Sequence, residues 1–193
     1  SLLEFLRKHD KQCGVIYCAT RSKVESVTQQ LQRHGFKALR YHAGLTPEER
    51  RNNQNAFVGG LVPLIVATNA FGMGIDKADV RFVVHYNMPK DVESYYQEAG
   101  RAGRDGLESE CLLLYDKADI AVNTYLIGHD QPDLAWKAHE MELLQKMTFY
   151  CNTSGCLRRV LLEYFGEKAP AKCNHCGNCD ANKNASWRRF LDL

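Results

Sequence analysis

The chain has 193 residues, of which 45% are hydrophobic and 25% are charged, as in a globular protein of one domain with a small appendage. Its 25 lysines and arginines nearly balance 23 aspartates and glutamates, so the formal net charge is +2. That small charge excludes binding to nucleic acid or to a membrane through the field of the whole molecule, and leaves such a role to local clusters. No apolar stretch approaches the roughly 20 residues of a membrane span and no secretory signal opens the chain, so we expect a cytosolic protein.

Strand-like apolar runs alternate with helical patterns over residues 14–127. This alternation predicts an α/β fold with a parallel sheet covered by crossover helices. The expected strands are 14–18, 36–41, 64–67, 80–84 and 111–115, and the expected helices run from residue 22 to 35, from residue 46 onward, over 91–100 and over 117–127. The order of these elements is that of a RecA-like lobe, although alternation indicates architecture and not activity.

Two of the expected helices begin with a capping signal. Ser22 and Glu25 have the spacing of a capping box, and Gly35 follows as a stop. Thr46 has the N-cap position of the next helix, with Pro47 at its first helical position. These signals predict where the first two helices of the lobe begin.

Beyond residue 130 the pattern changes, because no further strand-like run occurs. Two helices are expected there, over 133–150 and 155–165, as an antiparallel pair. The loop 172–180 follows them, and it is too short to bury a core and needs another stabiliser. The sequence therefore predicts a small helical second region with a specially stabilised last loop.

Cysteines supply a stabiliser for this loop. Three of them are each three residues apart, namely Cys173, Cys176 and Cys179. With Cys156, near the start of the preceding helix, they make four thiolates, which is the ligand set of a tetrahedral, structural Zn²⁺ site without an open position for catalysis. His175 and Cys151 stay open as alternatives to Cys156 for the fourth ligand.

Two other uses of the eight cysteines are disfavoured. Disulfides are disfavoured because nothing marks secretion, and because Cys13, Cys18 and Cys111 lie in or beside apolar strand runs, where free thiols behave as small hydrophobes. A redox switch would use one close pair of cysteines instead of three in a row.

Two arginines, Arg101 and Arg104, lie three residues apart among small residues in the run 95–106. Glycine and alanine let a backbone approach a phosphate closely, and the planar guanidinium matches phosphate oxygens, so we interpret this run as an arginine finger. If the segment is helical, the spacing puts both side chains on one face. A solvated basic helix is the alternative interpretation.

Two loops follow predicted strands at the carboxyl edge of the sheet, where open α/β folds bind ligands. At the loop 69–76, backbone amides and the Thr68 hydroxyl are available to a phosphate, and the Asp76 carboxylate to a ribose hydroxyl or an arginine. A plain turn in which the glycines only relieve strain is the alternative. The second loop, 41–45, holds His42, and a lone histidine there is more often structural than functional.

Together these segments resemble the RecQ-type DNA helicases, a branch of superfamily 2, over nearly the whole chain. The match is specific because several motifs occur in order. Residues 16–21 are similar to motif IV, 41–45 to the segment that faces the nucleic-acid strand, 67–77 to motif V, 96–106 to motif VI, and 156–159, 164–167 and the cysteine loop to the zinc-binding subdomain. The resemblance implies an ATP-dependent enzyme of DNA repair or recombination that unwinds duplex or forked DNA in the 3′-to-5′ direction, at the nucleoid of a bacterium or in the nucleus of a eukaryote.

The resemblance also implies roles for single residues. Arg104 would contact the γ-phosphate of ATP as the finger, with Arg101 and Gln97 beside it, and Gly74 and Asp76 would also contact the nucleotide. The residues implied to contact the DNA backbone are Thr20, Arg21, His42, Gly44 and Thr68. The positions that match the four zinc ligands of the family are Cys156, Cys173, Cys176 and Cys179.

Motifs that hold ATP and Mg²⁺ in a helicase are missing from the chain. Nothing matches Gly-x-x-x-x-Gly-Lys-Ser/Thr, and no Asp-Glu-x-His run occurs. The resemblance places these motifs in a first RecA-like lobe, expected before Ser1, and a winged-helix domain after Leu193. We therefore expect a piece of a longer chain that is inactive alone. Its predicted domains are the second RecA-like lobe at 1–128, a helical zinc-binding subdomain at 129–182 and the start of the next domain at 183–193.

Two other functional classes stay open. One is a non-enzymatic module that binds DNA or protein on a RecA-like scaffold, which the missing motifs permit. The other is a different superfamily 2 motor, such as an RNA helicase or a chromatin remodeller, because the pattern Gln-x-x-Gly-Arg-x-x-Arg-x-Gly is widely shared. The zinc segment argues against that second class.

Overall fold

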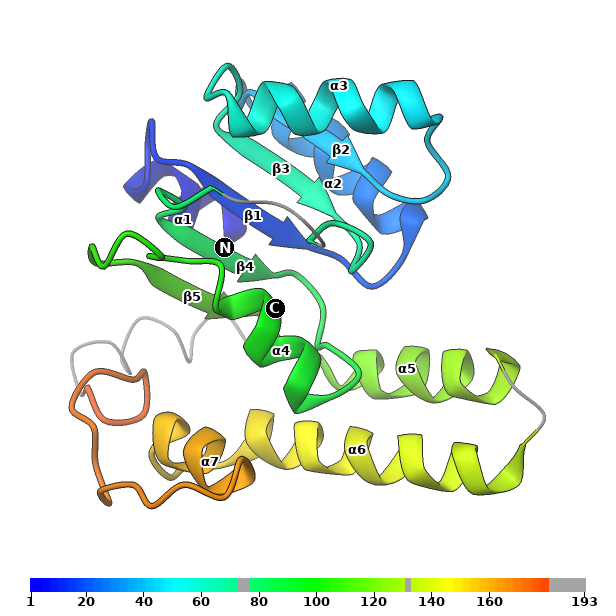
Figure 1. Ribbon diagram of the computed structural model, residues 1–193, viewed down its shortest axis with the longest axis vertical. Helices are drawn as coiled ribbons and strands as arrows, with labels where there is room; N and C mark the ends of the chain where they lie inside the picture. Colours follow the sequence, from blue (N-terminus) through cyan, green and yellow to red (C-terminus); the bar gives the residue numbers. More distant parts are fainter. Residues whose placement is uncertain (73–76, 131–132, 181–193) are drawn as a thin grey trace. The chain divides into compact units, whose positions relative to one another are not determined.

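The computed structural model describes residues 1–72, 77–130 and 133–180 of the chain. The described residues belong to two compact units, which Figure 1 draws as one ribbon. The first unit consists of Ser1–Asn87 and Gln97–Leu114, and the second of Met88–Tyr96 and the residues from Tyr115 onward. Within the described ranges, every helix is too short or too polar to cross a membrane.

The first unit is built on one parallel sheet of five strands in the order β2-β3-β1-β4-β5. The strands are β1 Gly14–Tyr17, β2 Ala38–Tyr41, β3 Leu64–Ala67, β4 Phe82–His85 and β5 Glu110–Leu113. Their first residues are aligned, because Gly14 lies opposite both Leu64 and Phe82. The last residues of the strands therefore meet at one edge of the sheet, as the arrowheads in Figure 1 show. This architecture confirms the predicted α/β fold.

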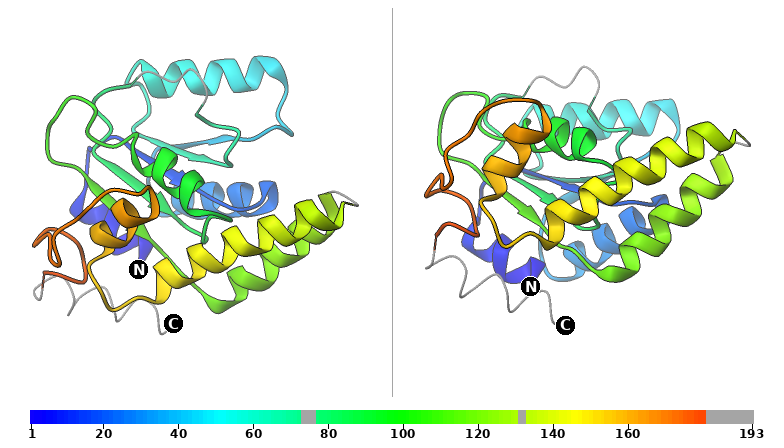
Figure 2. Two further views of the ribbon diagram at one scale, coloured as in Figure 1. Left: turned by 60° about the horizontal axis from the view of Figure 1, so that its bottom comes forward. Right: turned by 90° about the horizontal axis from the view of Figure 1, so that it is seen from below.

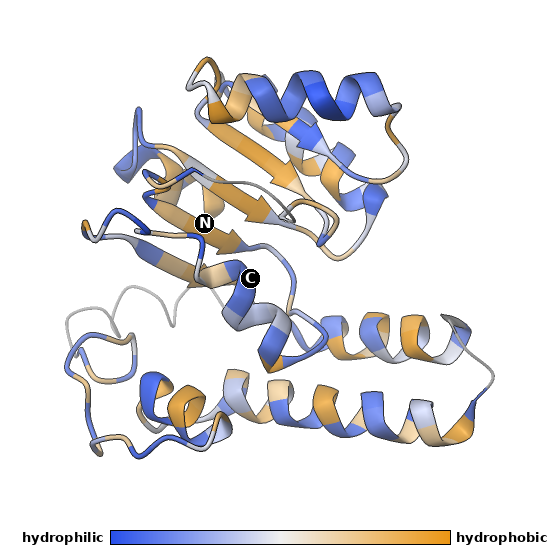
Figure 3. Ribbon diagram, viewed as in Figure 1, coloured by the Kyte–Doolittle hydropathy of each residue, from blue (hydrophilic) through white to orange (hydrophobic). Residues whose placement is uncertain are grey.

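Three strands, β1, β3 and β4, form the centre of the sheet, and all of their residues are buried. Figure 3 shows these strands among the most hydrophobic parts of the chain. Parallel strands that are covered on both faces are buried on both sides. For that reason they occur in the sequence as apolar runs instead of alternating ones, and only the last residues of β1 and β4, Tyr17 and His85, carry a polar group.

The first residue of β1 has no room for a side chain. A Cβ at Gly14 would lie 2.0 to 2.4 Å from three ring carbons of Phe82, a fully buried residue. Phe82 also packs edge-on against Phe5, with ring centroids 5.3 Å apart. Phe5 belongs to α1 (Leu2–Lys8), a helix that the sequence analysis did not predict. The close approach at this end of the sheet therefore requires glycine.

Capping signals predicted the starts of two helices in the first unit, and the structure confirms one of them. The remaining helices with residues in this unit are α2 Arg21–Arg33, α3 Pro47–Val58 and α4 Val92–Ala99. Thr46 caps α3 as predicted, and Glu49 completes a capping box. The predicted capping box at Ser22 is wrong. Thr20 caps α2 instead, because its backbone is extended and its hydroxyl accepts from the Lys23 backbone N–H at 3.2 Å.

The second unit contains three further helices, α5 Lys117–Asp130, α6 Leu134–Asn152 and α7 Leu157–Tyr164. The main partner of α6 is α5, and both views in Figure 2 show these two helices side by side. The sequence predicted a pair of α6 and α7, and these two helices also contact each other, although less extensively than α5 and α6 do. Because a short connection joins α5 to α6, the two run antiparallel. The structure thus groups α5 with the second unit, whereas the sequence analysis placed it in the first lobe.

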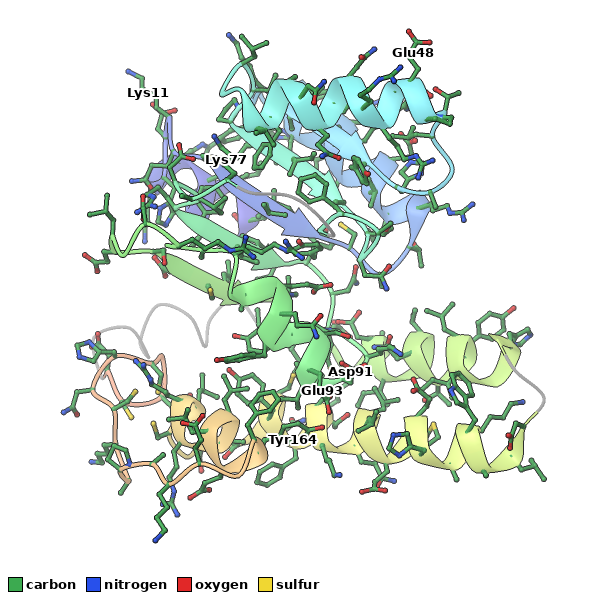
Figure 4. The ribbon with its side chains drawn as sticks, in the orientation of Figure 1. Lys11, Glu48, Lys77, Asp91, Glu93 and Tyr164 are labelled. Carbon is green, nitrogen blue, oxygen red and sulfur yellow. The ribbon has the colours of Figure 1, made fainter. Side chains whose placement is uncertain are left out.

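Polar contacts hold the segment 88–96 to the helices of the second unit. The Tyr150 hydroxyl of α6 donates to that of Tyr95 at 3.3 Å, and the two rings pack with centroids 5.1 Å apart. Tyr164 of α7 donates to the carboxylate of Glu93, and Figure 4 shows these two side chains close together. Both α6 and α7 are therefore tied to the residues that begin α4.

Candidate nucleotide and metal sites

Residues for which the sequence predicted DNA contacts gather at the carboxyl edge of the sheet. Thr20 and Arg21 follow β1, His42 and Gly44 follow β2, and Thr68 follows β3. The neighbouring strands β2, β3 and β1 are in register, so the loops that follow them lie next to one another (Figure 1). This edge is where open α/β sheets bind ligands.

His42 is buried, and both of its ring nitrogens are engaged inside the protein. Nδ1 accepts from the backbone N–H of Gly44 at 3.2 Å, which leaves the proton on Nε2, and Nε2 donates to Glu25 of α2 at 2.9 Å. A Cβ at Gly44 would lie 3.1 Å from His42 Nδ1. His42 therefore shapes the loop after β2 and offers no ring nitrogen to a ligand in this arrangement.

The carboxylate of Glu25 ties several elements together. Its second oxygen accepts from Arg40 of β2 at 2.8 Å, and Arg40 also reaches Glu49 of α3 at 3.4 Å. Partial burial raises the pKa of Glu25, but the hydrogen bonds from Arg40 and His42 outweigh burial and hold that pKa below its ordinary value of 4.5. An ionised carboxylate thus supports the edge at α2, β2 and α3.

The other residues of this edge differ in what they offer a ligand. Arg21 is exposed, and its Cδ lies 3.4 Å from the position of a Cβ at Gly44. Thr20 accepts one hydrogen bond as the cap of α2, which leaves its hydroxyl proton to donate. Thr68 is buried, in a turn that the Phe71 N–H closes by donating to the Thr68 carbonyl at 3.0 Å. Arg21 therefore presents the exposed positive charge among the five predicted residues.

The segment with the two arginines is a series of turns and not a helix. Helix α4 ends at Ala99, and the backbone N–H of Arg101 donates to the Glu98 carbonyl at 3.2 Å. The N–H of Gly103 then donates to the Val80 carbonyl at 2.9 Å, with φ of Gly103 at +66°. The condition for one shared helical face is therefore not met, and the two arginine side chains have different surroundings.

Arg101 is turned onto the backbone of the protein, whereas Arg104 is exposed. Arg101 Nη1 donates to the Gly72 carbonyl at 2.8 Å, and a Cβ at Gly72 would lie 2.1 Å from Arg101 Nη2. Arg104 Nε lies 3.4 Å from the Gly100 carbonyl. Gln97, on the last turn of α4, is also exposed. The predicted nucleotide contacts Gly74 and Asp76 lie outside the described residues.

Sequence reasoning missed two buried polar residues beside the arginine segment. Tyr17 ends β1 and His85 ends β4, and both are buried. Burial raises the pKa of the Tyr17 hydroxyl, while the charges of Arg101 and Arg104 act in the opposite direction. The available signal was a polar group as the last residue of an otherwise apolar strand.

Four cysteines of the second unit form one cluster. Their Sγ atoms all lie within 4.8 Å of one another, and Cys176 Sγ lies 3.9 Å from Cys156 Sγ. Four thiolates around zinc at about 2.3 Å are spaced by about 3.8 Å in a tetrahedron, so the cluster fits this metal. The cluster consists of Cys156, Cys173, Cys176 and Cys179. Among the described residues, the alternative ligands His175 and Cys151 are not part of it.

Backbone N–H groups support the cysteine sulfurs. The Arg159 N–H donates to Cys156 Sγ, the N-cap of α7, and the His175 N–H donates to Cys173 Sγ, both at 3.4 Å. Burial raises the pKa of Cys176, but hydrogen bonds, first that from the Leu157 backbone, lower it to about 6. Thiolate is the form that binds a metal.

The four remaining cysteines have the opposite character. Burial raises the pKa of each thiol, to about 12 for Cys13, Cys18 and Cys151 and to about 11 for Cys111. All eight cysteines are free of disulfide bonds. Cys18 is buried and Cys13 and Cys151 are half-buried, so these three behave as small hydrophobic residues, as predicted for Cys13 and Cys18; Cys111 is exposed.

Asn178 binds the cysteine loop to the turn before α7. Its Nδ2 donates to the Thr153 carbonyl at 2.9 Å and to the Gly155 carbonyl at 2.7 Å. Both hydrogens of one amide group are thus used on the residues that lead into Cys156. This amide joins the two parts of the chain that supply the ligands, without any metal in the contact.

Two protein families match the chain, one over most of the first unit and one over most of the second. The family described as helicase conserved C-terminal domain matches residues 1–106, and the family described as RecQ zinc-binding matches residues 117–180. The chain belongs to the RecQ-type helicases. The RecQ zinc-binding match and the four-cysteine cluster together identify a structural Zn²⁺ site.

Curated RecQ relatives match nearly the whole chain. The ATP-dependent DNA helicase RecQ of Bacillus subtilis (strain 168) is 45% identical over 182 residues, which are 94% of this chain and 31% of that protein. The enzyme of the same name from Pasteurella multocida is 43% identical over 178 residues, 92% of this chain and 28% of that protein. The chain therefore spans about three-tenths of the length of these RecQ proteins.

Solved structures share the fold. Dbp5 of Saccharomyces cerevisiae matches with a TM-score of 0.56 and 21% identity over 76% of this chain and 41% of that one. The DEAD-box protein SrmB of Escherichia coli matches with a TM-score of 0.55 and 22% identity over 65% of this chain and 76% of that one. These similarities confirm the RecA-like architecture of the RecQ-type lobe.

Proposed function

We propose that this chain is the second motor lobe and the zinc-binding unit of an ATP-dependent helicase that unwinds DNA in the 3′-to-5′ direction. The observation that carries the proposal is the division between the two arginines after α4. Arg101 is half-buried and donates to the Gly72 carbonyl, whereas Arg104 is exposed, donates from Nε to the Gly100 carbonyl of its own turn, and lies between glycines with positive φ, Gly103 and Gly106. A guanidinium in that setting can be delivered to a nucleotide held elsewhere.

In ATP hydrolysis, this lobe places a positive charge beside the transferred phosphoryl group. Arg104 supplies a guanidinium to the γ-phosphate of ATP, with Gln97 beside it, and Gly74 and Asp76 border the nucleotide. Such a finger neutralises the charge on the transferred phosphoryl group and contributes roughly three to five orders of magnitude in rate. The chain has no phosphate-binding loop of its own, so ATP and Mg²⁺ are held mainly by a first lobe.

The carboxyl edge of the sheet binds the DNA backbone. Arg21 supplies an exposed positive charge, and the Thr20 hydroxyl has a proton to donate to a phosphate oxygen. Gly44 and Thr68 lie in the loops next to them, and His42 holds the Gly44 loop in place. Contacts to phosphates carry no sequence information, as suits an enzyme that moves along any strand. Closure of two lobes around ATP and their reopening would then advance the strand.

An RNA strand is the second candidate substrate. A relative that is 38% identical over 92% of this chain is named a putative ATP-dependent RNA helicase, R290 of Acanthamoeba polyphaga mimivirus. The contacts described above are to the sugar–phosphate backbone and do not by themselves select DNA. The zinc-binding unit, which matches the RecQ family, favours DNA.

Strand separation by the intact protein that contains this chain tests the proposal. Duplexes with a 3′ tail, duplexes with a 5′ tail and RNA duplexes of the same sequence are compared, with and without ATP. Unwinding of the 3′-tailed DNA alone is expected, and none by the 193-residue chain. Unwinding that prefers RNA supports the second candidate. DNA-stimulated ATP turnover by the chain alone would contradict the proposal, because the chain lacks the phosphate-binding loop.

A further inference from the structure

The residues just after β3 are bonded by side chains from two other elements. The Tyr17 hydroxyl, at the end of β1, donates to the Phe71 carbonyl at 3.0 Å. The next carbonyl along the chain, that of Gly72, accepts from Arg101 Nη1 at 2.8 Å. Two consecutive carbonyls are therefore held, one from β1 and one from the arginine segment.

A second set of contacts joins Tyr17 back to the arginine segment. The Tyr17 ring stacks on that of His85, with centroids 5.6 Å and planes 22° apart. His85 is fully buried, and its Nε2 donates to the Glu98 carboxylate at 2.8 Å. The Glu98 carbonyl in turn accepts from the Arg101 backbone N–H at 3.2 Å. The contacts from Tyr17 through Phe71, Gly72, Arg101, Glu98 and His85 thus close into a ring, which we call the Tyr17 ring of contacts.

We propose that Arg101 is a positioning residue, and that the Tyr17 ring of contacts passes the position of the segment after β3 to the segment that carries Arg104. The inference rests on the proposed function for the role of Arg104 and for the DNA contact at Thr68. Thr68, at the edge assigned to the DNA strand, begins the turn that ends at Phe71. A change at that edge therefore moves the Gly72 carbonyl, then the Arg101 guanidinium, and with it the turns that lead to Arg104.

The residues of the Tyr17 ring of contacts are closely packed. A Cβ at Gly72 would lie 2.1 Å from Nη2 and 2.6 Å from Cζ of Arg101, so the guanidinium sits directly on this backbone. Ala102, the next residue after Arg101, packs against the core cluster that contains Tyr17 and Phe71. In a close-packed interior a displacement is passed on to the neighbouring groups.

The order of the Arg101 side chain can be measured on the 193-residue chain itself. Nuclear magnetic resonance of the arginine Nε–H groups reports their order on the fast timescale. Arg101 should be as ordered as the backbone, in contrast to the exposed Arg33. Gly72→Ala should release Arg101, because the added methyl occupies the place of its guanidinium. Gly60→Ala is the matched control, since Gly60 also has a positive φ, +75°, but nothing lies within 4 Å of its Cβ. Arg101 as mobile as Arg33, or unchanged order in Gly72→Ala, overturns the inference.

Tyr17→Phe tests the coupling, because it removes the hydroxyl and keeps the ring that stacks on His85. In the intact protein it should lower DNA-stimulated kcat about tenfold per nucleotide-binding molecule, with KM for ATP unchanged. Tyr164→Phe, which removes the hydroxyl bonded to Glu93, should leave kcat unchanged. If Tyr17→Phe lowers only the melting temperature, the role is structural and the inference is wrong. Normal turnover in Arg104→Ala would instead overturn the proposed function and leave the Arg101 resonance measurement standing.

Discussion

Asn178 offers a test of how the zinc site is assembled, because its side chain supports the site without being a ligand. Asn178→Ala removes both hydrogen bonds from Nδ2, to the Thr153 carbonyl at 2.9 Å and to the Gly155 carbonyl at 2.7 Å. The four cysteines and the backbone that leads to them are unchanged. The expected result is weaker zinc binding, because the cysteine loop loses its attachment to the turn before Cys156.

The size of the effect follows from these two bonds. A hydrogen bond in a protein contributes about 0.5–1.5 kcal/mol net, so two contribute about 1–3 kcal/mol. Thr153 is partly exposed and Gly155 is exposed, and water therefore reaches both carbonyls once the amide is gone. We expect the lower half of the range, about 1–2 kcal/mol. Since every 1.4 kcal/mol is a factor of ten, zinc should bind about 5- to 30-fold more weakly.

Competition with a coloured chelator on the 193-residue chain measures this affinity. Asn152→Ala is the matched control, because the Asn152 amide also donates two hydrogen bonds, to the Tyr115 hydroxyl at 3.1 Å and to the Thr148 carbonyl at 2.8 Å, but none to the cysteine loop. It should change zinc affinity less than about twofold. Wild-type affinity in Asn178→Ala, or an equal loss in both variants, would refute the reasoning.

Three further predictions concern the zinc ligands, the hydrophobic core and the loss of stability at acid pH. Cys176→Ala should lose zinc and expose the chain after about residue 155 to proteolysis, because a structural zinc site contributes folding free energy; stoichiometric metal in the purified variant would remove Cys176 from the ligands. Gly14→Ala should destabilise the first unit by at least about 1–3 kcal/mol in urea unfolding, because the added Cβ overlaps the buried ring of Phe82; an unchanged midpoint contradicts this. The folded-state pKa of Glu25 is lowered, so its interaction with Arg40 stabilises the fold above pH 4.5 and is lost as the pH falls through the folded-state value. Glu25→Gln should therefore reduce the difference in stability between neutral and acid solution, and an identical pH profile would show that the pair does not contribute.

The fold was largely predictable because its strands have a strong local signal. The runs 64–67 and 82–84 are apolar throughout, since a central parallel strand is buried on both faces. Helix boundaries were less certain, as the cap of α2 shows. Thr20 and Ser22 both have capping side chains, and the extended backbone at Thr20 decides between them. The short α1 was missed because its seven residues present too few turns for a clear periodicity.

The metal site was predictable and the arginine site only in part, for one physical reason. Thiolates at fixed spacing in a short loop are a local pattern, and the structure brings the predicted four together. The different surroundings of Arg101 and Arg104 depend instead on contacts with residues distant in sequence, such as Gly72. No local sequence pattern predicts that His85 stacks on Tyr17 and bonds to Glu98. The Tyr17 ring of contacts could therefore be found only in the folded structure.

The measurement that tests the central claim most directly is ATP turnover by the intact protein carrying Arg104→Ala. Arg33→Ala, which removes an exposed arginine at the end of α2, is the control. A finger on the γ-phosphate predicts that DNA-stimulated kcat falls about a thousandfold or more, while ATP still binds with nearly the wild-type affinity and Arg33→Ala behaves as wild type. Turnover near that of the wild type in Arg104→Ala would show that this lobe does not supply the finger.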